Sequence, residues 1–124
     1  MYKRQGIYLQ YAQVRARKIL NSAEKVVRVS FKDELNNDER NLILEISKFY
    51  YHFFQSLNKN EPHHLAEYGY TLSQFFNTFY SNNKILSEEI SDSDRQKRIY
   101  IVQLFHQKIL NVFESLGIEP VEKM

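Results

Sequence analysis

The sequence predicts an all-α fold, an antiparallel bundle of about four helices, and three features indicate it. Apolar residues recur at steps of three and four through four separate stretches of the 124-residue chain, which is the period of amphipathic helices. Short polar segments with capping residues separate these stretches. The stretch 62–86, around which the others are organised, begins with Pro62, a residue that suits the first position of a helix.

The first helix is expected over residues 6–20, where aromatic and basic side chains share a surface. Its two neighbouring stripes consist of Tyr8, Ala12, Arg15 and Ile19, and of Ile7, Tyr11, Val14 and Lys18. Such a surface can stack on unpaired bases while it holds phosphates. Aromatic residues at helical spacing are more often core, and from the residues alone we favour half-buried core positions for Tyr8 and Tyr11.

Residues 21–37 connect this helix to the next. The connector has some extended character but no partner strand, so we interpret it as a loop laid over the core. The second helix starts near Asn36 or Asn37, since Asn36 and Glu39 have the spacing of a capping box, and it continues to about Leu57. Its apolar stripe comprises Leu42, Ile43, Ile46, Phe49, Tyr50, Phe53 and Phe54.

The third helix is the central stretch, and the polar run 81–83 ends it. Its stripe comprises Leu65, Tyr68, Gly69, Leu72, Phe75, Phe76 and Phe79. Glycine costs about 1 kcal/mol relative to alanine in a helix interior. We therefore expect another helix to pass close to Gly69, although a glycine that is merely tolerated is the alternative.

The last helix follows the acidic segment 87–94, with its N-cap expected at Ser91 or Ser93. Gly117 stands where a left-handed C-terminal residue is favoured, and Pro120 prevents continuation, which leaves a short non-helical tail. The buried stripe of this helix comprises Ile99, Val102, Phe105, Ile109, Val112, Phe113 and Leu116.

The composition indicates one domain and argues against a catalytic site. The chain has no cysteine, so disulfides and thiolate metal sites are excluded, and no apolar run reaches the roughly 20 residues that span a bilayer. We therefore expect a soluble, cytoplasmic protein. The four histidines lack the spacing of a zinc helix, and neither a glycine-rich phosphate loop nor a Ser-His-acid arrangement occurs, so no metal site and no catalytic residue are expected.

Positive charge gathers in the first quarter of the chain. Residues 1–32 carry eight Lys and Arg against one acidic residue, whereas the remainder carries nine against fourteen. Basic charge on one element is typical of a phosphate-rich partner. The alternative is a solvated face that happens to be basic.

Residues 1–5 differ in character from the rest of the chain. The run Tyr2-Lys3-Arg4-Gln5 resembles the translation of a transposon-end adapter used in sequencing libraries. Our hypothesis is that residues 1–5 are a non-native leader, that the domain spans residues 6–124, and that the native coding sequence continues upstream. A genuine stop codon directly before Met1 at the genomic locus would contradict it.

Three motifs occur in succession along the chain. The first is Tyr8-Leu9-Gln10-Tyr11-Ala12, followed by Arg15. The second runs from Glu61-Pro62-His63-His64-Leu65-Ala66 to Phe76-Asn77-Thr78-Phe79-Tyr80, and the third is the ending Leu116-Gly117-Ile118-Glu119-Pro120-Val121-Glu122-Lys123-Met124. Together they resemble the C-terminal, DALR-type anticodon-binding domain of arginyl-tRNA synthetases. The resemblance covers residues 8–124.

The chain departs from the pattern of this family at three positions. Gln13 and Val14 stand where His and Ala are common, and Tyr50 stands where a proline often interrupts the second helix. We therefore expect the second helix to run straighter here. None of the three departures argues against anticodon binding.

The resemblance implies recognition of tRNA(Arg) within an ATP-dependent aminoacyl-tRNA synthetase, the arginine–tRNA ligase of protein biosynthesis. The catalytic domain of such an enzyme, which uses ATP and Mg, would lie upstream and is absent from this chain. We therefore expect the 124 residues alone to be inactive and to hold no cofactor. The implied partners are the anticodon loop of tRNA(Arg) and the missing catalytic domain, with no membrane and no DNA.

The resemblance also assigns the site. In the family, the anticodon loop lies against the first helix, the aromatic end of the central helix and the chain terminus. By motif, the tRNA-binding residues are Tyr8, Ala12, Arg15, Arg17, Tyr80 and Met124. The resemblance favours stacking of bases on Tyr8 and Tyr80, and phosphate contacts from Arg15 and Arg17, with an internal structural role as the alternative for Arg15. We assign four other aromatic residues to the core, namely Tyr11, Phe75, Phe76 and Phe79.

Two alternatives stay open. One is the similar domain of another class I synthetase or of the bacterial glycyl-tRNA synthetase β subunit, although the Gln-Tyr-Ala helix and the tail that ends in Met argue against both. The other is a helical protein-interaction module without a nucleic-acid role. Strong salt dependence of tRNA binding would distinguish an RNA-binding domain from such a module.

Overall fold

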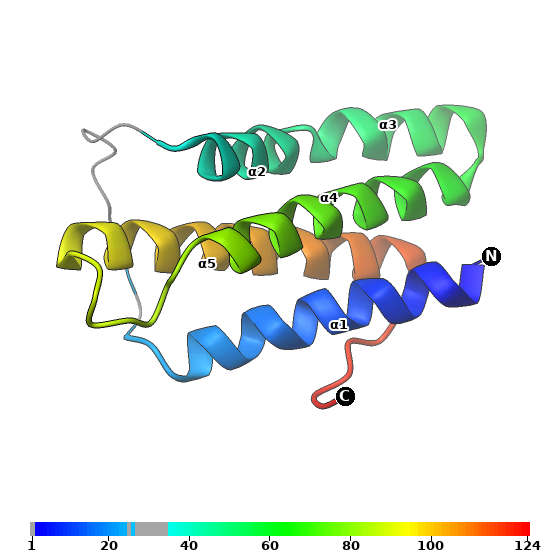
Figure 1. Cartoon of the computed structure of the whole chain (residues 1–124). Helices are drawn as coiled ribbons and strands as arrows, with labels where there is room; N and C mark the ends of the chain where they lie inside the picture. Colours follow the sequence, from blue (N-terminus) through cyan, green and yellow to red (C-terminus); the bar gives the residue numbers. More distant parts are fainter. Residues whose placement is uncertain (1, 25, 27–34) are drawn as a thin grey trace.

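The computed structural model describes residues 2–24, 26 and 35–124, with side chains from residue 6 onward. These residues form the helices α1 (Tyr2–Asn21), α2 (Asn37–Ser47), α3 (Phe49–Lys59), α4 (Pro62–Asn82) and α5 (Asp92–Leu116). Helices α2 and α3 follow one another in the same direction as one arm, and α1, this arm, α4 and α5 alternate in direction (Figure 1). The expected all-α antiparallel bundle is confirmed, whereas most of the connector 21–37 lies outside the described residues.

Helix α4 occupies the centre of the bundle. It packs against α1, α2, α3 and α5, and in Figure 1 it lies between the α2–α3 arm and α1. The rings of Phe76 on α4 and Phe105 on α5 stack with their centroids 4.1 Å apart and their planes within 7°. Both rings are fully buried, as are those of Phe79 and Phe113, so the core has an aromatic centre.

At Gly69, helix α4 packs closely against two neighbouring helices. A Cβ at this position would stand 2.7 Å from Leu9 Cδ2 on α1 and 3.1 Å from Val112 Cγ1 on α5. Both distances are shorter than ordinary van der Waals contact. The close helix approach expected at this glycine is therefore confirmed.

The helix ends follow the local signals. The Asn36 side chain accepts from the Glu39 N–H, and the Glu39 carboxylate accepts from the Asn36 N–H, which is the expected capping box. Ser91, not Ser93, is the N-cap of α5, where its Oγ accepts from the Asp94 N–H. Gly117 adopts φ +70°, the left-handed conformation expected at the end of α5.

The second helix is broken, so the single, straighter helix expected over this stretch is wrong. Helix α2 ends at Ser47, α3 begins at Phe49, and the Lys48 N–H bonds back three residues to Glu45 O. The buried Tyr68 hydroxyl donates to Glu45 O at 2.6 Å and lies 3.3 Å from Ile46 O. A side chain that inserts into the hydrogen-bond ladder of a helix is a recognised cause of a kink.

Two residues expected in the buried stripe of this arm, Tyr50 and Phe54, are more than half exposed. Each lies one residue beyond a stripe member, Phe49 or Phe53, and one residue turns a helix by about 100°. Helix α3 packs mainly on α4, so only a narrow stripe of it is covered. Tyr51 and Leu57 are exposed as well, which gives α3 an apolar outer face.

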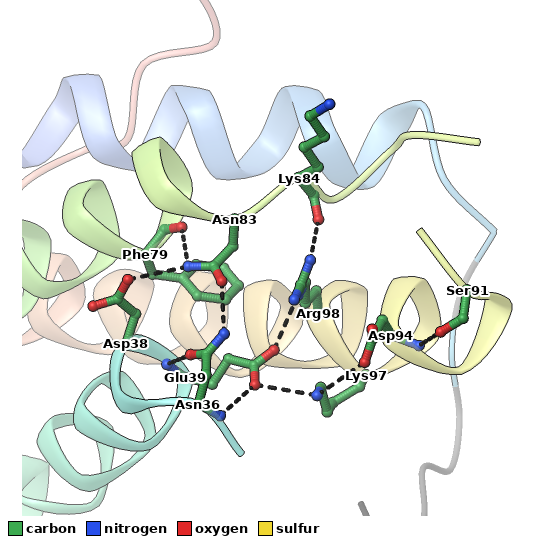
Figure 2. Close-up of polar contacts among 10 residues, drawn as sticks. All are labelled: Asn36, Asp38, Glu39, Phe79, Asn83, Lys84, Ser91, Asp94, Lys97 and Arg98. Atoms are coloured by element: carbon green, nitrogen blue, oxygen red, sulfur yellow. Dashed lines mark hydrogen bonds and ion pairs between the residues drawn. The ribbon is translucent and has the colours of Figure 1, made fainter. Parts of the chain in front are cut away.

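A polar network joins three helix ends (Figure 2). The fully buried Glu39 carboxylate accepts from Lys97 Nζ at 3.1 Å and from Arg98 Nε at 3.0 Å, in addition to its capping bond. Arg98 also donates to Lys84 O at 2.8 Å, just beyond α4. The starts of α2 and α5 are thereby fixed to the segment that follows α4. Among the described helices, none has the length and apolar character needed to cross a membrane.

Candidate nucleic-acid interface

A groove of about 450 Å³ lies between α1, the last turns of α4 and the chain terminus. Two of the residues that line it are cationic and none is acidic. The lining consists of Tyr8, Tyr11, Val14, Arg15, Lys18, Ile19, Asn77, Tyr80 and Met124. Proteins that bind single-stranded nucleic acids use aromatic rings beside positive charges, because the bases stack on the rings and the phosphates pair with the cations.

Helical geometry accounts for this gathering. Tyr8, Tyr11, Arg15 and Lys18 follow one another at steps of three and four, so they share one face of α1. Helix α4 passes alongside and brings Tyr80 to the same groove near its C-terminal end. The C-terminal tail returns along α1 after α5 ends, as Figure 1 shows.

The Asn77 amide links the two helices. Its Nδ2 donates to Tyr8 Oη at 2.9 Å, and its Oδ1 accepts from an Arg15 guanidinium nitrogen at 2.9 Å. The Arg15 guanidinium carbon in turn lies 4.4 Å from the centre of the Tyr80 ring, within the range of a cation–π contact. The Tyr8 hydroxyl oxygen accepts the hydrogen bond from Asn77, so the hydroxyl proton remains available for donation.

Tyr80 separates the groove from a second hollow. Its side chain is 40% exposed, and the hollow beyond it, of about 400 Å³, is lined also by Ile19, Asn83, Lys84 and Leu86, among others. Arg15 lies over the Tyr80 ring, so the guanidinium and the ring together offer a layered flat surface. Both a guanidinium plane and an aromatic ring are surfaces on which unpaired bases stack.

Four of the six residues predicted to bind tRNA meet at this groove, namely Tyr8, Arg15, Tyr80 and Met124. Ala12 is fully buried in the core and has no surface to offer a nucleotide. Arg17 lies outside the groove lining and close to His106 on α5, where burial and the charge of Arg17 lower the pKa of the imidazole.

Sequence reasoning missed three groove residues. Tyr11, which we assigned to the core, is 57% exposed, so that assignment is wrong. The sequence placed Lys18 on the same stripe as Tyr11, but we did not assign it to the binding site, although that stripe carried the signal. Asn77 precedes Tyr80 by three residues, but its bonds to α1 depend on how the two helices pack.

The histidines form one close pair outside the groove. His52 Nδ1 on α3 lies 3.1 Å from His64 Nε2 on α4, and the two rings stand next to the buried Tyr68. Within the described part of the chain, no group of three or more His, Cys, Asp or Glu side chains is placed to hold a metal ion.

Comparison with known proteins identifies relatives of this arrangement. Residues 9–124 match the family model of the DALR anticodon binding domain. The arginine–tRNA ligase of Methanopyrus kandleri is 38% identical over 124 residues, which is 99% of this chain and 21% of the relative. That of Archaeoglobus fulgidus is 34% identical over 120 residues, 94% of this chain and 22% of the relative.

A solved structure agrees with these relatives. Thermus thermophilus arginyl-tRNA synthetase superposes with a TM-score of 0.82 at 26% identity, over 94% of this chain and 21% of that one. The chain thus spans about a fifth of the length of the proteins it matches.

Proposed function

Because the chain belongs to the DALR anticodon-binding domain family, we propose that its groove binds the anticodon loop of tRNA(Arg). The single observation that carries the proposal is the meeting of Tyr8, Arg15, Tyr80 and Met124 at one cationic groove. The relatives that support the choice of tRNA are named arginine–tRNA ligases.

Each groove residue has a proposed role that follows from its chemistry. Tyr80 and Tyr8 stack on splayed anticodon bases, and the free proton of the Tyr8 hydroxyl is available to a base edge or a ribose. Arg15 and Lys18 hold phosphates, which positions the loop without reading its sequence. Arg17 is at most a contact to phosphates outside the groove, and Ala12 contributes packing alone.

The proposal extends to a longer protein. We infer that this domain serves an arginine–tRNA ligase, whose catalytic domain binds ATP and Mg and works with the cytoplasmic translation machinery. The 124 residues by themselves are then expected to catalyse no arginine-dependent exchange between ATP and pyrophosphate. Exchange by the purified chain above background would contradict this assignment.

Fluorescence anisotropy with a labelled tRNA(Arg) anticodon stem-loop tests the binding site. Tyr80→Ala should weaken binding about tenfold, since stacking contributes roughly 1–3 kcal/mol per base, whereas Tyr80→Phe should be milder because the ring remains. Tyr51→Ala is the matched control, because Tyr51 is exposed on α3 and does not line the groove. Unchanged affinity in folded Tyr80→Ala and Tyr8→Ala variants would reject the groove.

Salt dependence separates base contacts from phosphate contacts. Arg15→Ala should weaken binding to any stem-loop and make the logarithm of affinity fall less steeply with the logarithm of salt, because a phosphate contact is lost. Arg17→Ala should change that slope less, since Arg17 is not a groove residue. A stem-loop with an unrelated anticodon that binds equally tightly would contradict recognition of tRNA(Arg), and binding that ignores salt would favour a protein-interaction module.

A further inference from the structure

Two glutamines of α1 bind the backbone of the C-terminal tail. Gln10 Nε2 donates to Glu119 O at 2.9 Å, and Gln10 Oε1 accepts from the Val121 N–H at 3.0 Å. Gln13 Nε2 donates to Val121 O at 2.9 Å. One primary amide that both donates to and accepts from an extended backbone imitates a neighbouring strand.

Both glutamines are buried, and the tail supplies three of the hydrogen bonds that their amides make. Gln13 is fully buried and Gln10 nearly so. A buried amide that loses its hydrogen bonds is unfavourable, so both side chains favour the conformation in which the tail is docked. Residues 119–121 therefore lie on a fixed path along α1, although they belong to no regular element.

His106 fixes the orientation of the second amide. His106 Nε2 on α5 lies 3.3 Å from Gln13 Oε1. The nitrogen of Gln13 is already committed to Val121 O, so its oxygen faces the histidine, and the hydrogen-bonding pattern places the imidazole proton on Nε2. The orientation of the Gln13 amide is thus set from both sides, by the tail and by α5.

Met124 follows these bonds closely along the chain. It is the third residue after Val121, and three residues span at most roughly 10 Å when fully extended. Met124, which lines the groove, can therefore reach it only while Val121 is held close by. The position of the last residue depends on two side chains that do not line the groove.

We propose that Gln10 and Gln13 are positioning residues, which clamp residues 119–121 on α1 and so hold Met124 at the groove. The inference rests on the proposed function, because it treats Met124 as part of the surface that meets the anticodon loop. On this view, the two glutamines affect RNA binding without touching RNA. They act through the tail, and their effect disappears when the end of the tail is removed.

The first test needs no RNA. The chain has two methionines, Met1 and Met124, so methyl-¹³C labelling gives two methionine signals, and truncation after Lys123 assigns that of Met124. Gln10→Ala and Gln13→Ala should each move the Met124 methyl signal towards the value of an unstructured peptide. Gln74→Ala, which alters an exposed glutamine of α4, should leave it in place. An unchanged Met124 signal in both clamp variants would overturn the proposal.

A substitution in the tail tests the clamp without changing a buried residue, so that loss of the fold does not confuse the result. Val121→Pro removes the N–H that Gln10 accepts while the core is left intact, since Val121 is an exposed tail residue. It should release Met124 as the glutamine variants do, while the helical circular dichroism stays that of the parent. A folded Val121→Pro variant with Met124 still docked would overturn the proposal.

The second test measures RNA affinity. Each clamp variant should weaken stem-loop binding about fivefold, the effect expected from losing a contact of the hydrogen-bond scale. In a chain truncated after Glu122, Gln10→Ala should have no further effect. If Tyr80→Ala weakens binding but the clamp variants do not, this proposal is wrong and the proposed function stands. If neither Tyr80→Ala nor the clamp variants weaken binding, the proposed function is wrong, and so is the role of the two glutamines in RNA binding. The Met124 signal then still decides whether the glutamines hold the tail.

Discussion

At position 69, the lack of a side chain determines how closely three helices approach. Gly69→Ala should destabilise the fold by about 1–3 kcal/mol, because the new methyl group meets the buried Leu9 and Val112 side chains in a packed core. The loss should occur even though alanine favours a helix by about 1 kcal/mol relative to glycine. Urea unfolding followed by circular dichroism measures it.

Gly6→Ala is the matched control for this substitution. Gly6 also lies within a helix, but nothing stands within 4 Å of the position of its missing Cβ. Only the propensity term remains, so Gly6→Ala should stabilise the fold by up to about 1 kcal/mol. A Gly69→Ala variant that is as stable as Gly6→Ala would mean that Leu9 moves aside without loss.

His52 makes the stability depend on pH. Burial lowers the pKa of its imidazole, and electrostatic interactions with His64 and Lys48 lower it further, against an opposite effect of Glu45. In the unfolded chain the pKa is about 6.5. Between the two values the unfolded state binds more protons, so a fall in pH favours unfolding. The stabilising contribution is complete above about pH 6.5 and is lost as pH falls through the folded-state pKa.

The His52→Gln variant tests this dependence. Its free energy of unfolding should vary less between pH 7.5 and pH 5 than that of the parent. Part of the variation should persist, because burial also lowers the pKa of His106. His63→Gln, at a largely exposed position, serves as the control. A parent-like pH profile in the His52 variant would refute the assignment.

At the scale of helices, the ends were predictable and the break was not. A capping box, a serine N-cap and a left-handed glycine depend on residues within one turn of the helix end, so the sequence signals at Asn36, Ser91 and Gly117 sufficed. The break at Lys48 lies where the hydroxyl of Tyr68, a residue of another helix, donates to Glu45 O. Similarly, the exposure of Tyr50 and Phe54 follows from how few neighbours α3 has.

The Tyr68 hydroxyl should therefore contribute to stability. Tyr68→Phe leaves Glu45 O and Ile46 O without this donor in a buried place, and the expected cost is about 1–3 kcal/mol. Tyr51→Phe should cost much less, because the Tyr51 side chain is exposed on α3. Urea unfolding of both variants gives the comparison. If their costs are equal, water replaces the hydroxyl and the break has another cause.

At the scale of the whole molecule, the candidate site could be predicted in part. Periodicity along α1 puts Tyr8 and Arg15 on one face, and the motif resemblance added Tyr80 and Met124. The bonds that organise the site join helices that are distant in sequence. No local pattern indicates that Asn77 bridges Tyr8 and Arg15, or that glutamines on α1 bind the tail. The burial of Ala12 likewise follows only from helix packing.

The buried Glu39 network is the interaction that most clearly belongs to this scale, because its members come from the starts of two helices and the segment after a third (Figure 2). Glu39→Gln removes the negative charge and keeps the capping interaction, since glutamine also serves at this position of a capping box. The Arg98 guanidinium would then lose its carboxylate partner, and the almost fully buried Lys97 ammonium would keep only Asp94, at 3.2 Å. Breaking a buried ion pair in this way costs about 3–5 kcal/mol.

Glu89→Gln provides the comparison for that loss. Glu89 pairs with Lys84 at the surface, where both side chains are mostly exposed, and such pairs contribute at most about 1 kcal/mol. Urea unfolding at neutral pH should therefore give a several-fold larger loss for Glu39→Gln than for Glu89→Gln. Equal losses would mean that water reaches Lys97 and Arg98 once the charge is gone. The three helix ends would then be held together by packing, by the hydrogen bond between the Asn36 and Asn83 side chains and by that of Arg98 to Lys84 O, and not by the buried charge.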